Sequence, residues 1–180
     1  VCETLAGCSE SVYLVGHSMG GIAITQAAEV VPQKVKTLVY LTAFWLPSGR
    51  SLIEEAQADT GSAVLPNLVF ASDQSSATVK PDAIRDLFYA DCSPSDLALA
   101  QALLVPQAAA PFVTPIATTA ERWGSVPRVY IECTADQAIS LATQRTMQAR
   151  LPCKRVLTMS TSHSPFLSAP EALAEHLLSR

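Results

Sequence analysis

The residues best suited to chemistry form a short glycine-flanked segment, GHSMGG, at residues 16–21. An apolar run, Ser11–Val15, precedes this segment, and a pattern with helical spacing follows it from about residue 20 to residue 31. A G-x-S-x-G pattern between a strand and a helix is typical of a nucleophile elbow, a sharp turn that exposes the serine hydroxyl and leaves little room for side chains two positions away. Ser18 is therefore the candidate nucleophile, and the Met19 N–H, at the start of the helix, is a candidate donor to an oxyanion.

Two histidines follow Ser18 along the chain and could serve as its general base. His163 comes shortly after the apolar run Arg155–Met159, at the carboxyl end of a predicted strand, where open parallel sheets place their ligands. His176 lies within the final helical pattern, in a position typical of a solvated helix residue. We therefore interpret His163 as the base, with a loop histidine that caps a neighbouring element as the alternative.

A serine–histidine pair also needs a carboxylate that orients the imidazole ring. Asp136 follows the predicted strand Arg128–Cys133, again at a carboxyl end, and this position favours it as the acid. It could instead be the N-cap of the following helix, which is a frequent use of aspartate. Asp91 is the rival acid, but it lies inside a long insertion between strands, as do Asp73 and Asp82.

Strand and helix patterns alternate in the first and last parts of the chain, which is typical of parallel βαβ units. The sequence predicts strands over Ser11–Val15, Val35–Ala43, Arg128–Cys133 and Arg155–Met159, and helices over about 20–31, about 140–150 and from Pro170 onward. The candidate acid and base each follow the carboxyl end of one of these strands. The predicted fold class is therefore α/β, with a mostly parallel sheet.

The middle of the chain breaks this alternation. It is rich in Ala, Leu, Gln and Pro, with short helical patterns at Leu52–Ala58, Pro81–Tyr89 and Ser93–Leu104 and a loop pattern at Pro106–Pro115. Because no strand pattern is visible there, we interpret the insertion as a helical cap; a long crossover without function is the alternative. We expect three parts, namely a first core part (1–46), the helical cap (47–122) and a second core part (123–180).

Composition and charge argue against several classes of function. The chain has a formal net charge of −4, with 12 Lys plus Arg against 16 Asp plus Glu and no basic cluster, so binding to nucleic acid or anionic lipid is not expected. The longest apolar stretch, Leu38–Leu46, is about half the length that spans a bilayer. Five scattered cysteines without a C-x-x-C pair argue against a zinc site or a disulfide scaffold and favour a reducing, cytoplasmic compartment.

Four stretches give the chain a resemblance to a known family: YLVGHSMGG at 13–21, LFYADCS at 87–93, VPRVYI at 126–131 with the following Asp136, and HSPFLSAP at 163–170. It resembles the α/β-hydrolase branch that holds bacterial carboxylesterases, plant methylesterases and plant hydroxynitrile lyases. The resemblance implies an α/β-hydrolase fold with a cap over an apolar pocket and no cofactor. It also implies Ser18 as nucleophile, Asp136 as acid and His163 as base.

Members of this family place their first strands, and a loop that donates one oxyanion-hole N–H, before the elbow. This chain begins in a segment that resembles the helix just before the elbow strand, so the resemblance implies that the first half of the sheet lies outside residues 1–180, upstream or in a separate chain. We expect residues 1–180 alone, with one edge of Ser11–Val15 unpaired, to be poorly soluble and nearly inactive.

The sequence thus predicts a serine hydrolase that cleaves carboxylic esters through an acyl-enzyme. We expect a small, apolar, uncharged ester to bind between large apolar residues, which are Phe44, Trp45, Phe88, Leu103, Phe112 and Trp123. Two alternatives stay open, a hydroxynitrile lyase-like enzyme and a non-catalytic protein that binds small molecules. The resemblance argues against the lyase, because Ser164 stands where the family's lyases carry a lysine that holds the departing cyanide.

Overall fold

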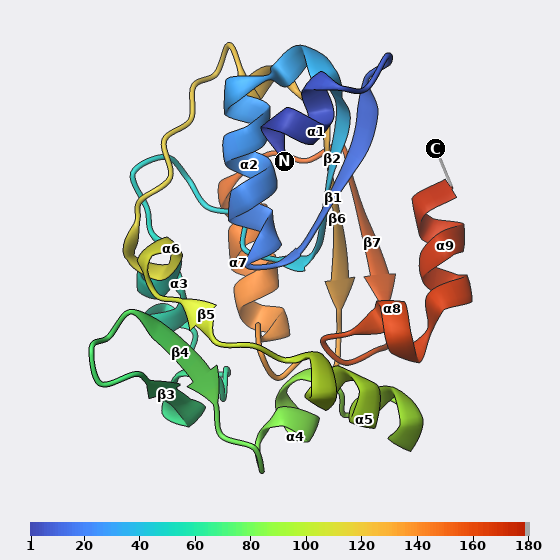
Figure 1. Ribbon diagram of the computed structural model, residues 1–180. Helices are drawn as coiled ribbons and strands as arrows, with labels where there is room; N and C mark the ends of the chain where they lie inside the picture. Colours follow the sequence, from blue (N-terminus) through green and yellow to red (C-terminus); the bar gives the residue numbers. More distant parts are fainter. Residues whose placement is uncertain (179–180) are drawn as a thin grey trace.

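A four-stranded parallel sheet forms the centre of the computed structural model, which describes residues 1–178 (Figure 1). In spatial order its strands are β1 (Val12–Ser18), β2 (Val35–Ala43), β6 (Arg128–Cys133) and β7 (Arg155–Met159). β2, β6 and β7 have the predicted bounds. β1 continues beyond the predicted end at Val15, because its last residues, through Ser18, keep pairing with β2. The predicted α/β fold class is confirmed.

Helices cover both faces of this sheet (Figure 1). They are α1 (Cys2–Ala6), α2 (Gly20–Val30), α7 (Leu141–Arg150), α8 (Pro165–Ser168) and α9 (Pro170–Leu178). α1, α2 and α7 pack on one face, where Ile24 of α2 and Met147 of α7 share a core cluster with Leu38 of β2. α9 packs on the other face, where Leu173 joins a smaller cluster with Ile131 of β6. The middle strands, β2 and β6, are therefore largely buried on both faces, which explains the near-continuous apolar run of β2.

The insertion lies across the end of the sheet at which β6 and β7 terminate (Figure 1). Its helices are α3 (Leu52–Ala58), α4 (Ile84–Phe88), α5 (Pro94–Leu103) and α6 (Ala110–Val113). It also holds an antiparallel sheet of β3 (Leu68–Phe70), β4 (Ser76–Val79) and β5 (Gln107–Ala108), with β4 in the middle. The expectation that the insertion lacks strands is therefore wrong, because strands of two to four residues are too short to show alternation.

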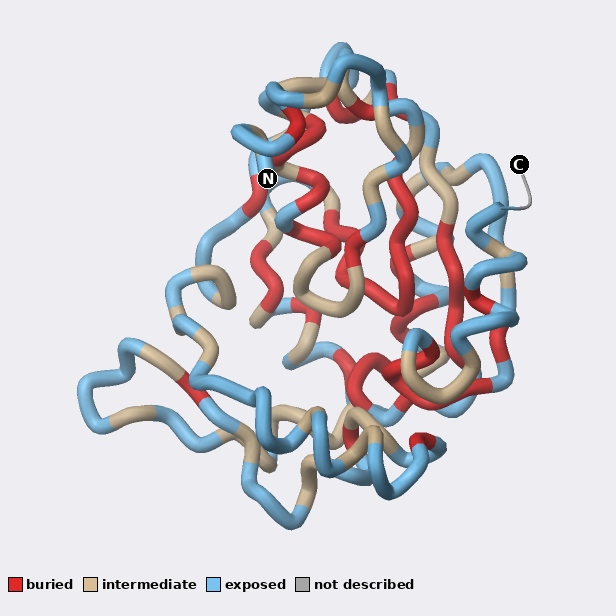
Figure 2. Tube along the Cα trace, turned by 45° about the vertical axis from the view of Figure 1, so that its right-hand side comes forward, coloured by how far each residue is buried: buried red, intermediate tan, exposed pale blue. Residues whose placement is uncertain are grey.

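Three short 3₁₀ helices complete the described elements: η1 (Pro32–Lys34), η2 (Leu65–Asn67) and η3 (Trp123–Ser125). Buried residues are concentrated in the central sheet and the adjoining helices, whereas most of the insertion is exposed or half-buried (Figure 2). β1 lies at one edge of the sheet, and its Tyr13 and Val15 are each 41% exposed. Within residues 1–178, no helix has the length and apolar character needed to cross a membrane.

Candidate active site

Ser18 is the last residue of β1, where the chain turns sharply into α2. Its φ angle is 54°, a left-handed conformation that is uncommon for a residue other than glycine. The Ser18 carbonyl accepts a hydrogen bond of 3.0 Å from the Phe44 N–H, which ties the turn to the end of β2. Met19 is the N-cap of α2, so its N–H is one of the donors for which the helix offers no carbonyl. This geometry is that of a nucleophile elbow.

Close backbone packing explains two of the three glycines in this turn. A Cβ atom on Gly16 would lie 2.7 Å from the Gly20 carbonyl oxygen, and one on Gly21 would lie 2.2 Å from the Phe44 carbonyl oxygen. A Cβ atom on Gly20 would meet no atom within 4 Å. The expectation that both positions two residues from Ser18 exclude a side chain is therefore wrong for Gly20. Gly21, which lies against the end of β2, is the second crowded position.

Asp136 and His163 form a buried pair at the ends of adjacent strands. The distance from His163 Nδ1 to Asp136 Oδ2 is 2.7 Å, and both side chains are shielded from solvent. Asp136 follows β6 and His163 follows β7, and the two loops are joined by a hydrogen bond of 3.0 Å from the Ala135 N–H to the Thr161 carbonyl. Because Nδ1 faces the carboxylate, Nε2 is the ring nitrogen that can exchange a proton with a nucleophile.

Hydrogen-bond donors surround the Asp136 carboxylate. The N–H groups of Ala138 and Ile139 donate to Oδ1 over 2.6 and 3.0 Å, and the Thr42 hydroxyl donates to Oδ2. Burial raises the pKa of Asp136, but the charge and hydrogen bond of His163, with the hydrogen bonds from Thr42 and Ile139, outweigh burial, so the pKa lies below the ordinary aspartate value. An ionised Asp136 can therefore stabilise positive charge on the imidazole of His163.

His17, to which the sequence analysis assigned no role, supports His163 from the side of the elbow. Its Nε2 lies 2.7 Å from the His163 carbonyl oxygen, and the two ring centroids are 4.5 Å apart. The Phe166 ring packs edge-on against His17 at 5.0 Å. Burial, with a smaller contribution from repulsion by His163, lowers the pKa of His17 to about 3. His17 is therefore neutral at physiological pH, and its Nε2–H donates to the carbonyl.

Ser18 lies on the wall of a cavity of about 650 Å³ that is bounded by the core and the insertion. Phe88 lines the same cavity and packs its ring 5.4 Å from the ring of His163, which places the candidate base beside the cavity wall. In the described part of the chain, no hydrogen bond joins the Ser18 hydroxyl to His163. Catalytic hydrogen bonds of this kind are often long until a substrate is bound.

The cavity wall is mainly apolar, and none of its described residues carries a charge. Core residues such as Phe44 and Ile139 face insertion residues such as Leu65 and Ile84 across it. The polar residues of the wall, besides Ser18, are Ser62, Thr78, Gln101 and Gln107. The volume falls within the usual range for small-molecule sites, about 300–1,000 Å³. The chemistry of the wall favours an uncharged ligand.

Three of the six predicted wall residues line this cavity: Phe44, Phe88 and Phe112. The prediction is wrong for the other three. Trp45 is fully buried in the core, stacked between Tyr40 and Tyr130 with centroid distances of 5.2 and 5.9 Å. Trp123 is also a core residue, whose indole N–H donates to the Tyr40 hydroxyl. Leu103 points to solvent and is 69% exposed.

The residues considered as alternatives to Asp136 and His163 do not take part in the buried pair. The Asp91 carboxylate accepts hydrogen bonds from the N–H and the hydroxyl of Ser162 and does not contact the His163 ring by a hydrogen bond. His176 lies on α9. The N-cap of α7 is Ser140, so Asp136 does not occupy that position. Among residues 1–178, no cluster of three or more His, Cys, Asp or Glu residues could hold a metal ion.

Known proteins resemble this chain in sequence and in fold. The chain matches the alpha/beta hydrolase family over residues 1–176. It is similar to the putative chloroplastic methylesterase 13 of Arabidopsis thaliana, with 29% identity over 94% of this chain and 40% of that protein. It is also similar to the pyrethroid hydrolase of Sphingobium wenxiniae, with 31% identity over 97% of this chain and 65% of that protein.

A solved structure, that of polyneuridine aldehyde esterase, superimposes with a TM-score of 0.87 and 26% identity, covering 98% of this chain and 74% of the other. The chain spans 40% and 65% of the lengths of the two curated relatives, which is less than two thirds of each. The family match nevertheless extends over nearly all of the residues present here, and the predicted resemblance is confirmed. The chain belongs to the alpha/beta hydrolase family.

Proposed function

We propose that this chain supplies the nucleophile, base and acid of a serine hydrolase that cleaves carboxylic esters. The observation that carries the proposal is the buried pair of Asp136 and His163 beside the same cavity that Ser18 lines. Relatives named as methylesterases and as a pyrethroid hydrolase support an ester as the substrate class. In this proposal Ser18 is the nucleophile, His163 is the base, and the ionised Asp136 is the acid that stabilises the protonated imidazole.

In the first step, the Ser18 oxygen bonds to the ester carbonyl carbon while His163 Nε2 takes the serine proton. The ionised Asp136 holds the imidazole in the required tautomer and stabilises its positive charge. The carbonyl oxygen becomes an oxyanion, to which the Met19 N–H at the start of α2 donates. His163 then returns the proton to the alcohol as it leaves, and the acyl group remains on Ser18.

In the second step, water attacks the acyl carbon while His163 Nε2 takes a proton from it. His163 then returns this proton to the Ser18 oxygen as the bond to the acyl carbon breaks, and the carboxylic acid is released. The released acid loses its proton to water at neutral pH, and the cavity wall offers no charged side chain to the resulting carboxylate among the described residues. The cavity therefore binds the neutral ester more favourably than the carboxylate product, because burying an unpaired charge is costly. This difference favours product release.

The substrate proposed for this site is a small, apolar, uncharged ester. We expect hydrolysis of p-nitrophenyl butyrate by the native polypeptide that contains residues 1–180, and much slower hydrolysis of p-nitrophenyl hemisuccinate, whose free carboxylate would enter the uncharged cavity. Ser18→Ala should abolish both reactions. Equal rates for the two esters would contradict the substrate class, and full activity of Ser18→Ala would contradict the nucleophile.

Ser164 distinguishes the proposed ester hydrolysis from the cyanohydrin cleavage that a hydroxynitrile lyase catalyses. Its side chain is buried directly beside His163 and carries no charge. A neutral hydroxyl cannot stabilise departing cyanide as an ammonium group would, so we expect no cyanide release from mandelonitrile. Cyanide release that Ser18→Ala abolishes would favour a lyase. A non-catalytic binding protein would instead be stabilised by neutral esters without hydrolysing them.

A further inference from the structure

The Asp91 carboxylate joins the insertion by hydrogen bonds to the segment that carries the candidate base. Asp91 lies between α4 and α5 and follows Phe88, the residue whose ring packs on His163. Its Oδ2 accepts the Ser162 N–H over 2.7 Å, and its Oδ1 accepts the Ser162 hydroxyl. Ser162 is the residue directly before His163 and is only 2% exposed. The carboxylate therefore fixes the backbone on which the imidazole is mounted.

The carbonyl groups of this segment are hydrogen-bonded to the core. The Thr161 carbonyl accepts the Ala135 N–H, and the His163 carbonyl accepts the His17 Nε2–H. These bonds hold the carbonyl groups on both sides of Ser162 in place. The N–H and the hydroxyl of Ser162 donate to Asp91 of the insertion instead, so both of these donors depend on one carboxylate.

We propose that Asp91 is a positioning residue that couples the insertion to the catalytic base. This inference rests on the proposed function. Without the carboxylate, the buried Ser162 N–H loses its acceptor, and satisfying it again requires the segment to move. Because His163 is the next residue, its Nε2 then moves away from the position at which it takes the Ser18 proton and returns it to the leaving alcohol. A displacement of about 1 Å at such a group costs on the order of a hundredfold in rate.

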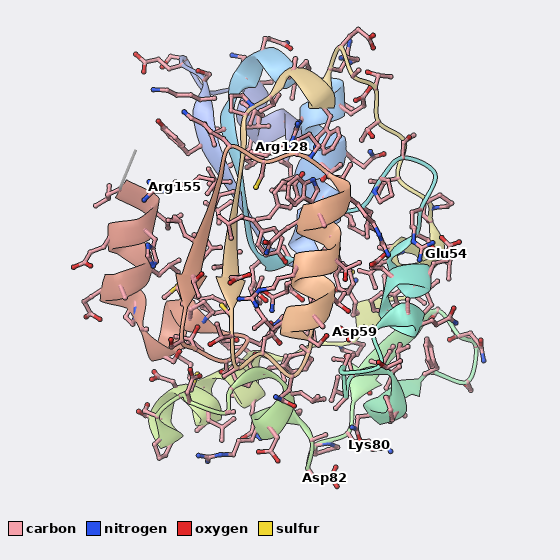
Figure 3. The ribbon with its side chains drawn as sticks, turned by 180° about the vertical axis from the view of Figure 1, so that it is seen from behind. Glu54, Asp59, Lys80, Asp82, Arg128 and Arg155 are labelled. Atoms are coloured by element: carbon pink, nitrogen blue, oxygen red, sulfur yellow. The ribbon has the colours of Figure 1, made fainter. Side chains whose placement is uncertain are left out.

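The chain offers a matched control for a merely structural effect. Asp59, at the end of α3, binds one serine in the same way, since its carboxylate accepts both the N–H (2.9 Å) and the hydroxyl (2.6 Å) of Ser140. Ser140 begins α7 and is far along the chain from His163. Figure 3 shows Asp59 near the amino end of α7, whereas Lys80 and Asp82 lie at the outer end of the insertion. Ser140 follows Ile139, whose N–H donates to the acid. Asp59→Ala thus loosens the insertion on the side of the acid and removes no hydrogen bond from the segment that carries His163.

The test is the inactivation of the native polypeptide by a fluorophosphonate, which separates the maximal rate constant (kinact) from the half-saturating concentration (KI). For Asp91→Ala, we expect kinact to fall about tenfold to a hundredfold, with KI changed by less than about twofold. Asp91→Asn should restore most of kinact, since its amide keeps an acceptor for the N–H and a partner for the hydroxyl. Asp59→Ala should raise KI or lower the melting temperature while kinact stays within about threefold.

A spectroscopic readout makes the test independent of turnover. The proton between His163 Nδ1 and Asp136 gives a downfield NMR resonance, which we expect to move or broaden in Asp91→Ala and to stay in place in Asp59→Ala. Should Asp91→Ala not fold, Ser162→Ala removes one of the two hydrogen bonds and should shift kinact and the resonance in the same direction, by less.

The inference is overturned if kinact and the resonance of Asp91→Ala equal those of the wild type, or if Asp91→Asn is as impaired as Asp91→Ala. It is also overturned if Asp91→Ala and Asp59→Ala change kinact and KI alike. Wild-type protein that does not react with the fluorophosphonate would instead contradict the proposed function. The NMR comparison of the aspartate variants would still decide whether Asp91 holds His163 in place.

Discussion

The buried neutral His17 makes the stability of this chain depend on pH well above the range in which carboxylates titrate. In the folded state the pKa of His17 is lowered to about 3, mainly by burial, from an ordinary value of 6.5. As the pH falls below 6.5, the unfolded chain takes up a proton at this position and the folded chain does not. The free energy of unfolding is therefore full above pH 6.5 and decreases as the pH falls toward 3.

The size of this effect follows from the two pKa values. Between pH 6.5 and pH 5, a span of about 1.5 pH units, the unfolded His17 carries a proton that the folded His17 lacks. Each unit of this span lowers the free energy of unfolding by about 1.36 kcal/mol, so the free energy falls by about 2 kcal/mol between pH 8 and pH 5. Asp136 contributes little in this window. Its pKa lies below the ordinary value, so its stabilising contribution is lost only in more acidic solution.

The comparison needed is urea unfolding of the wild type and of His17→Gln at pH 8, 6.5 and 5. Glutamine does not titrate, and its amide N–H can still donate to the His163 carbonyl. His163 and Asp136, which face His17, are present in both proteins, so their contributions to the free energy of unfolding cancel to first order. We expect the wild type to lose about 2 kcal/mol more than the variant between pH 8 and 5. Parallel pH dependences in the two proteins would refute this reasoning.

Three further predictions concern the acid, its hydrogen-bond donor and the glycines of the elbow. Asp136→Asn should keep the fold but lower kcat about 10⁴-fold in ester hydrolysis, because the imidazole is held in the wrong tautomer. Thr42→Val, which preserves the branched side chain at φ 34°, should lower kcat about tenfold, whereas Thr42→Ser should stay close to wild type. In thermal unfolding, Gly21→Ala should destabilise the chain by about 1–3 kcal/mol through contact with the end of β2, whereas Gly20→Ala should be nearly neutral.

Local sequence patterns were enough to predict the central sheet and the carboxyl ends of the strands after which the candidate residues lie. Apolar β-branched runs marked the bounds of β2, β6 and β7, and the glycines around Ser18 marked the turn. Chain order then placed Asp136 and His163 each after the carboxyl end of a predicted strand. These features are local, so the sequence expresses them directly.

Contacts between distant segments could not be predicted in this way. Thr42 donates to a carboxylate 94 residues away, from a positive-φ position at the end of β2 that no short pattern identifies. Asp91 holds a serine 71 residues away. Trp45 and Trp123 were predicted on the cavity wall because of their size, but ring stacking and a hydrogen bond to Tyr40 place them in the core. Size alone does not determine which side of a strand end a residue faces.

The central claim is that Ser18 is a nucleophile activated by His163 and Asp136. Its most direct test is peptide mapping by mass spectrometry after reaction with a fluorophosphonate, in which the serine oxygen bonds to phosphorus, fluoride leaves and the base accepts the proton. We predict a single phosphonylated serine, Ser18, in the wild type, and slow or absent modification of Ser18 in His163→Ala. A phosphonate on another residue, or equal labelling of Ser18 with and without His163, would contradict the claim.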